Sequence, residues 1–350
     1  MCAFLNCHFL EGNDGVTKKQ KKIDSVRLQN IVQGYGQSAA LMAGVELDIF
    51  TAISEGAQTI EAISKAVDIH PVNAERLVTM LAAMGILHFQ DNCYRNADDA
   101  EKFLVTTSPS YAGPWMLFTK PNWMEWGRLS EHLRAKDLSV LGPIGDFGIE
   151  EARAYHKATY SIGMGAGRRF VQHVDLTGRK MILDLGGGSG AYCINAVKAF
   201  DGLKARVFDL PPVAEIAREF IAENGVSDRV EAVGGDFTND PFPEDSDVVI
   251  MASNLPMYGP DVIGNVIQKA FGALLPGGEM HLIGETLNDD RVGPIGPAYW
   301  GLGQAISETL GVAHSEADCV RYFESAGFID VTVEPFIKGS LSRIQGIKPL

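Results

Sequence analysis

Apolar residues in the first third of the chain recur at the spacing of helices. Ile31 and Tyr35 belong to a run of such positions at intervals of three and four, which is typical of an amphipathic helix. Two short helices are predicted next, and the second begins at Pro71 and ends at Gly85. Two short apolar runs around an Asp-Asn turn then predict a β-hairpin. Together these elements predict a winged helix over residues 23–105.

The segments on either side of this unit have a different composition. Residues 1–22 include glycines and four lysines. Burial of their few apolar side chains would not offset the conformational entropy lost on ordering, so a flexible tail is predicted there. Residues 106–165 contain three of the four tryptophans, many helix-forming residues and a break at Gly142-Pro143. They predict a helical connector that also covers a substrate site.

The pattern changes again over residues 166–350, where apolar runs of strand length alternate with helical stretches. Such alternation predicts a parallel sheet with right-handed crossovers. A helix over residues 315–326, opened by a capping-box-like Ser-x-x-Asp, and two further strands complete the predicted α/β domain. The five interleaved runs are Met181–Leu185, Ala205–Leu210, Val230–Gly234, Val248–Ala252 and Met280–Ile283.

Composition supports a folded protein of two domains. The chain has 350 residues, of which 46% are hydrophobic and 21% charged, so it can bury a full core. Its formal net charge of −14 opposes binding to nucleic acid and to anionic membranes. No apolar run is long enough to span a bilayer, and the start lacks the basic region of a signal peptide. We therefore expect a cytoplasmic protein without nucleic-acid or membrane partners.

A winged helix can bind DNA, but the predicted recognition helix lacks the basic side chains that this requires. Between Pro71 and Gly85 it has one arginine, Arg76. An apolar stripe of Ile31, Tyr35, Met42 and Phe50 has no partner in so small a domain, so the winged helix is predicted to form a homodimer. The five cysteines are Cys2, Cys7, Cys93, Cys193 and Cys319; without a C-x-x-C pair they predict reduced thiols and no metal site.

The strongest chemical motif is the glycine-rich turn after the first strand of the α/β domain. Residues 182–191 read Ile-Leu-Asp-Leu-Gly-Gly-Gly-Ser-Gly-Ala. Glycines at such a turn let the backbone approach a ligand and expose the first N–H groups of the next helix. Because Gly186, Gly188 and Ala191 also satisfy the dinucleotide pattern G-x-G-x-x-G/A, the motif alone is compatible with NAD.

Acidic residues at the strand ends favour S-adenosylmethionine over NAD. Asp184 precedes the loop, where it would repel a pyrophosphate but attract an ammonium group. Asp209 ends the second strand and can accept both ribose hydroxyls. After the third strand, Asp236 can accept the adenine amine and Phe237 can stack on the ring.

With these motifs the chain resembles the small-molecule O-methyltransferases that join a winged-helix dimerisation domain to a class I S-adenosylmethionine-binding fold. The resemblance implies an α/β fold with a class I, Rossmann-like methyltransferase sheet and an N-terminal α-helical winged-helix dimerisation domain. It also implies S-adenosylmethionine as cofactor, a small-molecule substrate and a homodimer. The motifs that carry it are Asp184–Gly190, Phe208–Pro211, Gly235–Phe237, Leu275–Gly278 and Glu324–Phe328. The predicted cofactor-binding residues are Asp184, Gly186, Gly188, Asp209, Leu210, Asp236, Phe237 and Ser253.

The sequence departs from this family at the catalytic base. Family members carry His-Asp-Trp after the fourth strand, and the histidine takes the proton from the substrate hydroxyl. Here these positions fall on Pro256, Met257 and Tyr258, and proline cannot act as a base. One assisting glutamate of the family is retained as Glu285. A base is worth about 10² to 10⁴ in rate, so its loss favours an acceptor without a proton.

A thioether sulfur is such an acceptor, because methylation gives a sulfonium directly. The main hypothesis is therefore an S-methyltransferase that works by alignment alone on a molecule such as 4-methylthio-2-hydroxybutyrate, in a pocket whose aromatic faces attract the sulfonium. Its carboxylate would need a cation, for which Arg128, Arg168 and Arg169 are available. The predicted residues at the methyl site are Tyr155, His156, Tyr160 and Glu285, and those at the substrate are Trp115, Trp123, Trp126, Tyr258, Tyr299 and Trp300.

Two alternatives stay open at this level. An O-methyltransferase could use a different base: His156, which alignment places beside the methyl site, His314, next to the lost glutamate of the family, or Tyr258. A methyltransferase-like domain that binds its ligand without catalysis would carry the same cofactor motifs. The aromatic residues could also be ordinary packing residues of the core.

Overall fold

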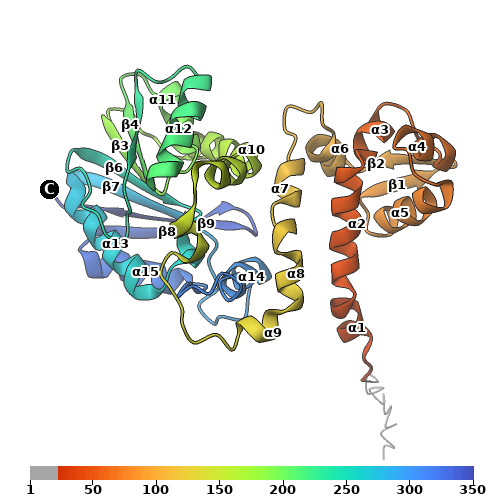
Figure 1. The fold of residues 1–350 in the computed structure, drawn as a ribbon. Helices are drawn as coiled ribbons and strands as arrows, with labels where there is room; N and C mark the ends of the chain where they lie inside the picture. The colour runs from red at the N-terminus through yellow and green to blue at the C-terminus, as the bar shows by residue number, and fades with distance from the viewer. Residues whose placement is uncertain (1–22) are drawn as a thin grey trace, which may run out of the picture.

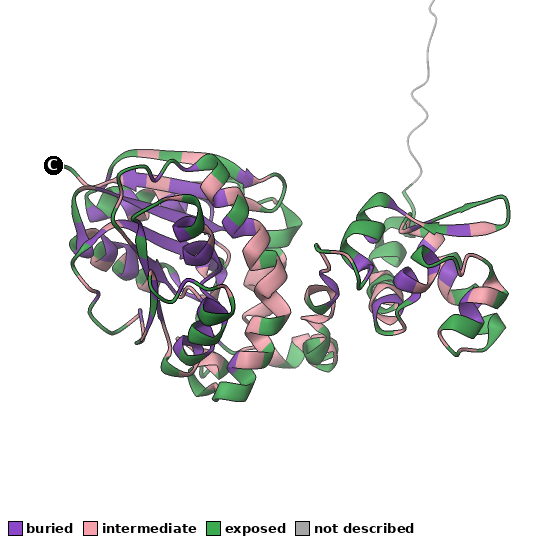
Figure 2. Ribbon diagram, turned by 90° about the horizontal axis from the view of Figure 1, so that it is seen from above, coloured by how far each residue is buried: buried purple, intermediate pink, exposed green. Residues whose placement is uncertain are grey.

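The computed structural model describes residues 23–350, and the predicted tail over residues 1–22 lies outside these described residues. Two lobes are joined by a helical connector that runs between them (Figure 1). The larger lobe contains the sheet, where buried residues concentrate (Figure 2). No helix in the described part of the chain is long and apolar enough to cross a membrane.

The smaller lobe has the elements of a winged helix around its own core. The Thr59 side chain caps one helix by accepting from Ala62 N, and Pro71 stands at the start of the next. Phe50 is fully buried in this core, so its predicted place on an exposed stripe is wrong. The elements are α1 Val26–Val32, α2 Gly34–Glu46, α3 Ile49–Ser54, α4 Ile60–Ala66, α5 Pro71–Ala83, β1 Leu87–Gln90, β2 Cys93–Asn96 and α6 Asp98–Leu104.

Short helices make up the connector, and one long helix, α10, leads from it into the larger lobe. Helix α10 has 25 residues, and the predicted boundary between residues 165 and 166 falls inside it. Its surface contacts both α7 and α11, so the connector is held directly on the sheet lobe. The elements are α7 Gly113–Leu117, η1 Lys120–Asn122, α8 Trp123–Gly127, α9 Leu129–His132, η2 Gly142–Asp146 and α10 Ile149–His173.

Seven strands form the sheet in the order β5-β4-β3-β6-β7-β9-β8, and the predicted α/β class is confirmed. Strands β3 to β7 run parallel, whereas β9 is antiparallel to both β7 and β8. The short connection between β8 and β9 leaves room only for an antiparallel return. The strands are β3 Met181–Leu185, β4 Lys204–Asp209, β5 Val230–Gly234, β6 Ser246–Ala252, β7 Leu274–Gly284, β8 Ile329–Ile337 and β9 Leu341–Ile347.

Helices cover both faces of the sheet, so its central strand is buried on each side. Ile182 faces the core shared with α10, α11 and α12, and Leu183 faces the core shared with α13 and α15. The side chains alternate because successive strand residues point to opposite faces. The remaining elements are α11 Ala191–Ala199, α12 Pro211–Glu223, η3 Leu255–Met257, α13 Pro260–Ala273, α14 Ile295–Gly303 and α15 Glu316–Ala326.

The predicted capping box at the start of α15 is present and buried. Ser315 Oγ accepts from Asp318 N at 3.1 Å, and Asp318 Oδ2 accepts from Ser315 N at 2.8 Å. Asp318 also pairs with Arg291 and Arg321. This network ties the long loop before α14 to the helix that packs on the far face of the sheet.

Replacement of Ser315 by alanine should therefore lower the free energy of unfolding by about 1 kcal/mol, because one buried N–H loses its acceptor. Urea unfolding followed by circular dichroism measures this change. Ser340→Ala, at an exposed turn, is the matched control and should have little effect. Equal stability of the Ser315 variant and the wild type would show that the box does not stabilise the helix.

Candidate functional site

The glycine loop after β3 adopts a conformation that only glycine adopts without strain. Gly186 and Gly188 have φ of 63° and 56°. A Cβ on Gly186 would lie 2.5 Å from Asn254 Nδ2, and a Cβ on Gly188 would lie 2.8 Å from the His156 ring. The glycine loop is therefore a tight cradle, because its backbone packs closely against Asn254 of the loop after β6 and against His156 of helix α10.

Asp209, at the end of β4, holds this loop in place. Its Oδ2 accepts from Gly188 N at 2.8 Å and its Oδ1 accepts from Leu210 N at 2.7 Å. Burial raises the pKa of this carboxyl to about 6, against the lowering effect of the two N–H donors. Asp209 and Leu210 both line the pocket in front of the loop, as the sequence predicts for a ribose-binding acid and its neighbour.

Asp184 lies behind the loop and does not line the pocket. It is 1% exposed, and the Cys193 thiol donates to its Oδ2 at 3.5 Å. Its Oδ1 is buried without a hydrogen-bond partner among the described residues, and burial raises its pKa to about 7. Direct contact with a ligand ammonium, as predicted, is not what this geometry shows; the carboxylate supports the loop from beneath.

The loop after β5 presents Asp236 and Phe237 to the same pocket. Asp236 Oδ1 accepts from Thr238 N and Oγ1, and its Oδ2 accepts from Asn239 Nδ2. The Phe237 ring stands edge-on to Tyr258 with centroids 5.2 Å apart. An aromatic face and a carboxylate side by side are suited to a flat, amine-bearing ring such as adenine.

Sequence reasoning chose Ser253 after β6 and missed its neighbour Asn254. Ser253 is exposed, with φ of 61°, and does not line the pocket. Asn254 does: its Nδ2 donates to Leu185 O at 3.0 Å and Gly186 O at 3.3 Å. The sequence does show Asn254 two residues after the end of β6, and its amide could have been chosen as a candidate. The backbone turn at Ser253, which the sequence does not show, decides that the side chain of Asn254 points into the pocket.

These elements together line one pocket in front of the glycine loop. It combines a backbone cradle, two carboxylates and aromatic rings. The lining residues are Leu141, Ile144, Phe147, Tyr155, His156, Gly186, Asp209, Leu210, Val213, Asp236, Phe237, Asn254, Met257 and Tyr258.

Helix α10 contributes two of the four predicted catalytic residues to the pocket. Tyr155 and His156 line it, one residue apart along the helix. Burial lowers the pKa of His156 to about 4, so the imidazole is neutral at neutral pH. Burial and the charges of Asp209 and Glu285 raise the pKa of Tyr155 to about 12, so its hydroxyl keeps its proton.

The other two residues of that set lie outside the pocket lining. Tyr160 points toward α12, where it stacks on Phe220 at 4.3 Å and accepts from Asn224 Nδ2 at 2.6 Å. The geometry gives it a packing role, because one turn of helix carries it away from the pocket. Glu285 follows the end of β7, and burial raises its pKa.

A continuous set of aromatic rings leads from α14 through the connector to the pocket. Trp300 lies 6.2 Å from Trp115, Trp115 stacks on Phe118 at 5.2 Å, and Phe118 meets the edge of Tyr155 at 5.0 Å. Trp126 stacks on Tyr299 at 5.0 Å, and Tyr299 meets Trp300 edge-on. We call these rings the aromatic wall: Trp115, Phe118, Trp126, Tyr155, Tyr299 and Trp300.

Five of the predicted substrate residues are therefore brought near the site, and Phe118 is a residue that the sequence analysis missed. Tyr258 is 5% exposed and lines the pocket. Trp123, half-buried at the start of α8, belongs neither to the pocket lining nor to the aromatic wall. Packing against rings of α10 and α14 decides which of these connector rings join the aromatic wall.

The structure narrows the choice among substitute bases. His314 is 1% exposed, and its two nitrogens contact Tyr322 Oη at 3.0 Å and Tyr258 O at 2.9 Å, so neither is free. Burial and nearby carboxylates raise the pKa of Tyr258 above its usual value, which keeps the hydroxyl protonated. Pro256 is buried in η3. The imidazole of His156 makes no hydrogen bond to another residue among residues 23–350, and His156 lines the pocket.

The three arginines considered as carboxylate anchors have other partners or positions. Arg128 pairs with Glu125 and Glu131 on the connector surface. Arg169 donates to the backbone carbonyl of Phe336. Neither these two nor Arg168 lines the pocket. A cation for a substrate carboxylate, which the thioether hypothesis requires, is absent from the pocket lining in the part of the chain that the structure describes.

Comparison with known proteins agrees with this architecture. An O-methyltransferase domain model matches residues 147–329, and an O-methyltransferase dimerisation domain model matches residues 29–106. The tetracenomycin polyketide synthesis 8-O-methyl transferase TcmO of Streptomyces glaucescens is 30% identical over 310 residues, or 87% of this chain and 91% of that protein. The 3-hydroxy-5-methyl-1-naphthoate 3-O-methyltransferase of Streptomyces sahachiroi is 28% identical, with 92% and 94% covered.

A solved structure shares the fold over nearly the whole chain. Human N-acetylserotonin methyltransferase in complex with S-adenosylmethionine superposes with a TM-score of 0.79 at 23% identity, covering 94% of this chain and 99% of that one. The glycine cradle, the loop-holding Asp209 and the Asp236-Phe237 pair fit the same cofactor. The chain is therefore an S-adenosylmethionine-dependent methyltransferase of small molecules and belongs to the O-methyltransferase family with an N-terminal dimerisation domain.

Proposed function

We propose that this enzyme methylates a hydroxyl group on an aromatic small molecule. The observation that carries the proposal is the aromatic wall, which leads from α14 to the methyl site at Tyr155. Flat rings stack well on such side chains. The relatives add support, since the two named above are O-methyltransferases of a polyketide and a naphthoate. This reading replaces the thioether hypothesis, which the relatives do not support.

In this proposal the pocket divides into a cofactor half and an acceptor half. Asp209 accepts the ribose hydroxyls, Asp236 and Phe237 hold the adenine, and the loop from Gly186 to Gly188 takes the methionine part. When bound, S-adenosylmethionine supplies an electrophilic methyl group. Tyr155 and the aromatic wall hold the acceptor ring, so that the hydroxyl oxygen points at the methyl carbon.

His156 accepts the proton that leaves the acceptor hydroxyl. As the oxygen–carbon bond forms and the carbon–sulfur bond breaks, the oxygen loses its proton to a neutral imidazole nitrogen. The low pKa of His156 keeps this nitrogen unprotonated at neutral pH. The role that family members assign to a histidine after β6 thus moves to helix α10.

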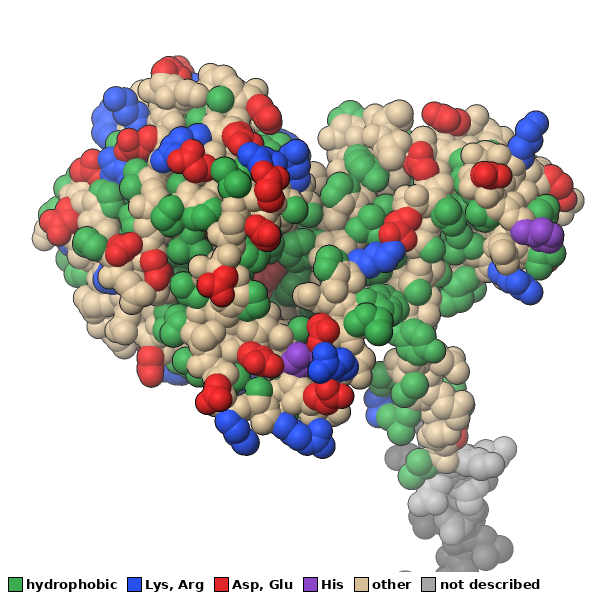
Figure 3. Space-filling view, in the orientation of Figure 1, with side chains coloured by type: hydrophobic (Ala, Val, Ile, Leu, Met, Phe, Trp, Pro, Cys, Tyr) green, Lys and Arg blue, Asp and Glu red, His purple; other side chains and the backbone are tan. Residues whose placement is uncertain are grey.

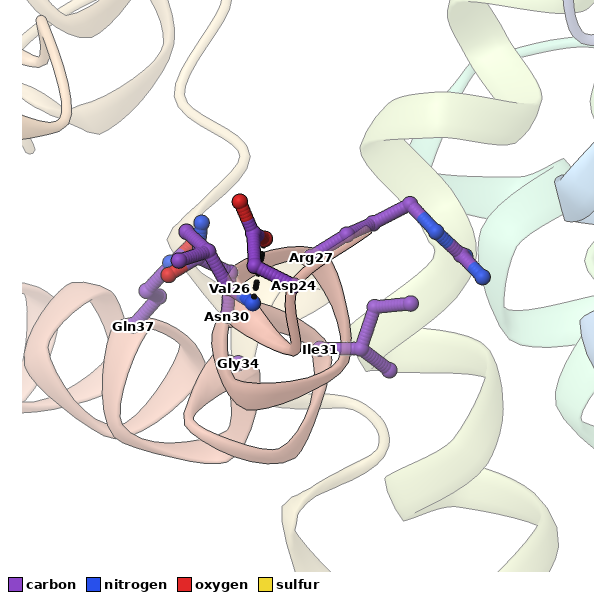
Figure 4. Close-up of a pocket in the computed structure, with 7 residues that line it drawn as sticks. All are labelled: Asp24, Val26, Arg27, Asn30, Ile31, Gly34 and Gln37. Carbon is purple, nitrogen blue, oxygen red and sulfur yellow. Dashed lines mark hydrogen bonds between the residues drawn. The ribbon is translucent and has the colours of Figure 1, made fainter. Parts of the chain in front are cut away.

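We also propose that the chain forms a homodimer through the start of its dimerisation domain. Ile31 and Val32 on α1 are 63% and 71% exposed, and Tyr35 on α2 is 70% exposed. Beside them an open groove is lined by residues of α1 and α2, with Ile31 and Arg27 extending from the helix (Figure 4). Apolar side chains this exposed at the edge of a lobe are typical of an interface.

The acceptor atom can be identified by product analysis. Purified enzyme incubated with labelled S-adenosylmethionine and a panel of naphthols and thioether acids should give methyl ethers of the naphthols. Mass spectrometry distinguishes these from sulfonium products. His156→Ala should lower kcat by about 10²-fold or more, whereas His173→Ala, an exposed histidine on the same helix, should leave kcat unchanged.

The pH profile adds a second readout for His156. With an acceptor whose hydroxyl stays protonated, kcat should be level from about pH 6 to 8 and fall below about pH 5, where the imidazole becomes protonated. Sulfonium as the main product would contradict O-methylation. Full activity of His156→Ala would contradict only the role of the histidine.

Binding of S-adenosylmethionine should depend on pH through Asp209. The carboxyl is protonated below its pKa of about 6 and then no longer attracts the cationic cofactor. Affinity should therefore fall by up to about tenfold from pH 7 to pH 5 and be level from pH 7 to pH 8. Isothermal calorimetry measures this. Asp209→Asn should bind more weakly at pH 7 and lose the pH dependence; a variant with the same pH slope as wild type would refute the assignment.

The oligomeric state can be measured by light scattering at micromolar concentration. Wild type should have twice the mass of the chain, and the double variant Ile31→Glu, Val32→Glu should be monomeric, because two charges would be buried at the interface. Ile329→Glu, at an exposed site on β8, is the control and should stay dimeric. A monomeric wild type would rule out the proposal.

A further inference from the structure

The loop after β5 is folded around Asp236 by hydrogen bonds within the loop. Asp236 Oδ1 accepts from Thr238 N at 2.8 Å, and its Oδ2 accepts from Asn239 Nδ2 at 2.7 Å. The backbone N–H of Asp236 donates to Asp240 Oδ2 at 2.8 Å. These bonds shape the loop, but none of them attaches it to another element. Because Asp236 and Phe237 both line the pocket, the contacts that fix them relative to the sheet matter for a ligand.

Lys269 of α13 provides such an attachment. Its Nζ donates to Phe237 O at 2.8 Å and lies 4.4 Å from the centroid of the Phe242 ring. Phe242 meets the edge of Phe208 of β4, with centroids 5.6 Å apart. The next residue of α13, Ala270, is fully buried, so the lysine extends from a part of the helix that is anchored in the core. One ammonium group thus connects two positions of the loop to α13.

The peptide group between Phe237 and Thr238 links the lysine to the pocket. Its carbonyl accepts from Lys269, and its N–H donates to Asp236 Oδ1. Because a trans peptide is planar, the two bonds leave it on opposite sides and fix its orientation. A positive charge at the carbonyl also polarises the peptide and strengthens the bond made by its N–H. Lys269 therefore orients the Asp236 carboxylate through a single peptide plane.

The same contact holds the backbone that carries the Phe237 ring. This ring is buried and packs closely on the glycine loop, since a Cβ on Gly186 would lie 2.9 Å from it. Tyr258 meets the ring at 5.2 Å. A shift of the Phe237 backbone would therefore move the ring and the neighbouring carboxylate of Asp236 together.

An ordinary surface role does not account for the position of Lys269. Charged side chains of both signs are interspersed over the face of the molecule shown in Figure 3, whereas Lys269 is half-buried. Burial lowers its pKa, against the opposing effect of Asp236 and Asp240. Its close contacts among residues 23–350 are a carbonyl and a ring rather than a carboxylate. It does not line the pocket, so it acts on a ligand through the loop.

We infer that Lys269 is a positioning residue for the adenine end of the cofactor. It holds the peptide after Phe237, and with it the Asp236 carboxylate and the Phe237 ring, in the arrangement that receives a flat, amine-bearing base. The inference rests on the proposed placement of adenine at Asp236 and Phe237. Because an oriented carboxylate accepts from an amine and repels a carbonyl oxygen, the lysine also supports selection of adenine over hypoxanthine.

Lys269→Met tests this role, because methionine keeps much of the apolar stem and loses the donor. The Kd for S-adenosylhomocysteine, measured by calorimetry, should rise by about tenfold, the effect of one hydrogen bond to a charged group. Lys269→Arg can still donate to Phe237 O and should bind within about threefold of wild type. Equal affinity of Lys269→Met and wild type would overturn the inference.

Lys348 offers a matched control, because it makes the same kind of contact at the end of α13. Its Nζ donates to the carbonyls of Gly272 and Leu274 and lies 5.0 Å from the centroid of the Phe271 ring. Lys348→Met should lower the free energy of unfolding about as much as Lys269→Met, but it should leave the Kd unchanged. If both variants weaken binding equally, the effect is one of general stability and the inference is wrong.

The base of the ligand gives a readout that general stability would not change. S-inosylhomocysteine has a carbonyl oxygen where S-adenosylhomocysteine has the adenine amine. Wild type should bind it at least about tenfold more weakly, because the carboxylate loses its donor. In Lys269→Met this ratio should fall to about threefold or less. An unchanged ratio in the variant would contradict the role of the lysine.

Failure of the inference and failure of the adenine placement give different results. Asp236→Ala should weaken binding of S-adenosylhomocysteine if adenine lies at Asp236. Weaker binding by Asp236→Ala together with unchanged binding by Lys269→Met keeps the placement and refutes the role of the lysine. Unchanged binding by both variants refutes the placement and the inference with it. Binding is measured without acceptor, so these results do not depend on which atom the enzyme methylates.

Discussion

The close approach of four chain segments at the glycine loop is the constraint on which the site depends. The Asp209 carboxylate accepts from Gly188 N, Asn254 donates to the carbonyls of Leu185 and Gly186, and the His156 ring rests against Gly188. A Cβ at either glycine would collide with these groups. The shape of the cradle therefore depends on contacts from β4, the loop after β6 and helix α10.

The proposed function keeps the chemistry of the family but takes its base from a different element. Proline at position 256 removes the imidazole that family members place after β6, and the surrounding η3 turn stays buried. On α10, the neutral His156 lines the pocket next to Tyr155. Because proton transfer needs only an acceptor within reach of the hydroxyl, either element can provide it.

The connector links substrate choice to the arrangement of the two lobes. Its short helices place Trp115, Phe118 and Trp126 against rings of α10 and α14, so the aromatic wall is built from three elements far apart in sequence. His132, held between glutamates of α8 and of the segment after α14, ties the same layers together at the surface. In the proposed function, these aromatic side chains hold the planar ring of the acceptor.

The sequence by itself determined the elements, the sheet domain and the cofactor class. Alternating apolar runs located β3 to β7, the Ser-x-x-Asp pattern located α15, and the order of glycines and strand-end acids pointed to S-adenosylmethionine. These features are local, or follow from one rule, that parallel strands end at the same edge. The sequence also showed that Pro256 cannot be a base, since that conclusion depends on residue type alone.

Only the tertiary structure decided which side chains face the pocket and which are engaged elsewhere. Tyr160 and His156 lie on the same helix, yet one packs on α12 and the other faces the glycine loop, because four residues of helix separate them by about 6 Å along the helix axis. Asn254 replaces Ser253 because of the backbone turn between them, and His314 is excluded because its two nitrogens meet partners from distant segments. Sequence spacing carries no record of such contacts: they arise from packing between elements, where direction and distance are fixed by the fold as a whole.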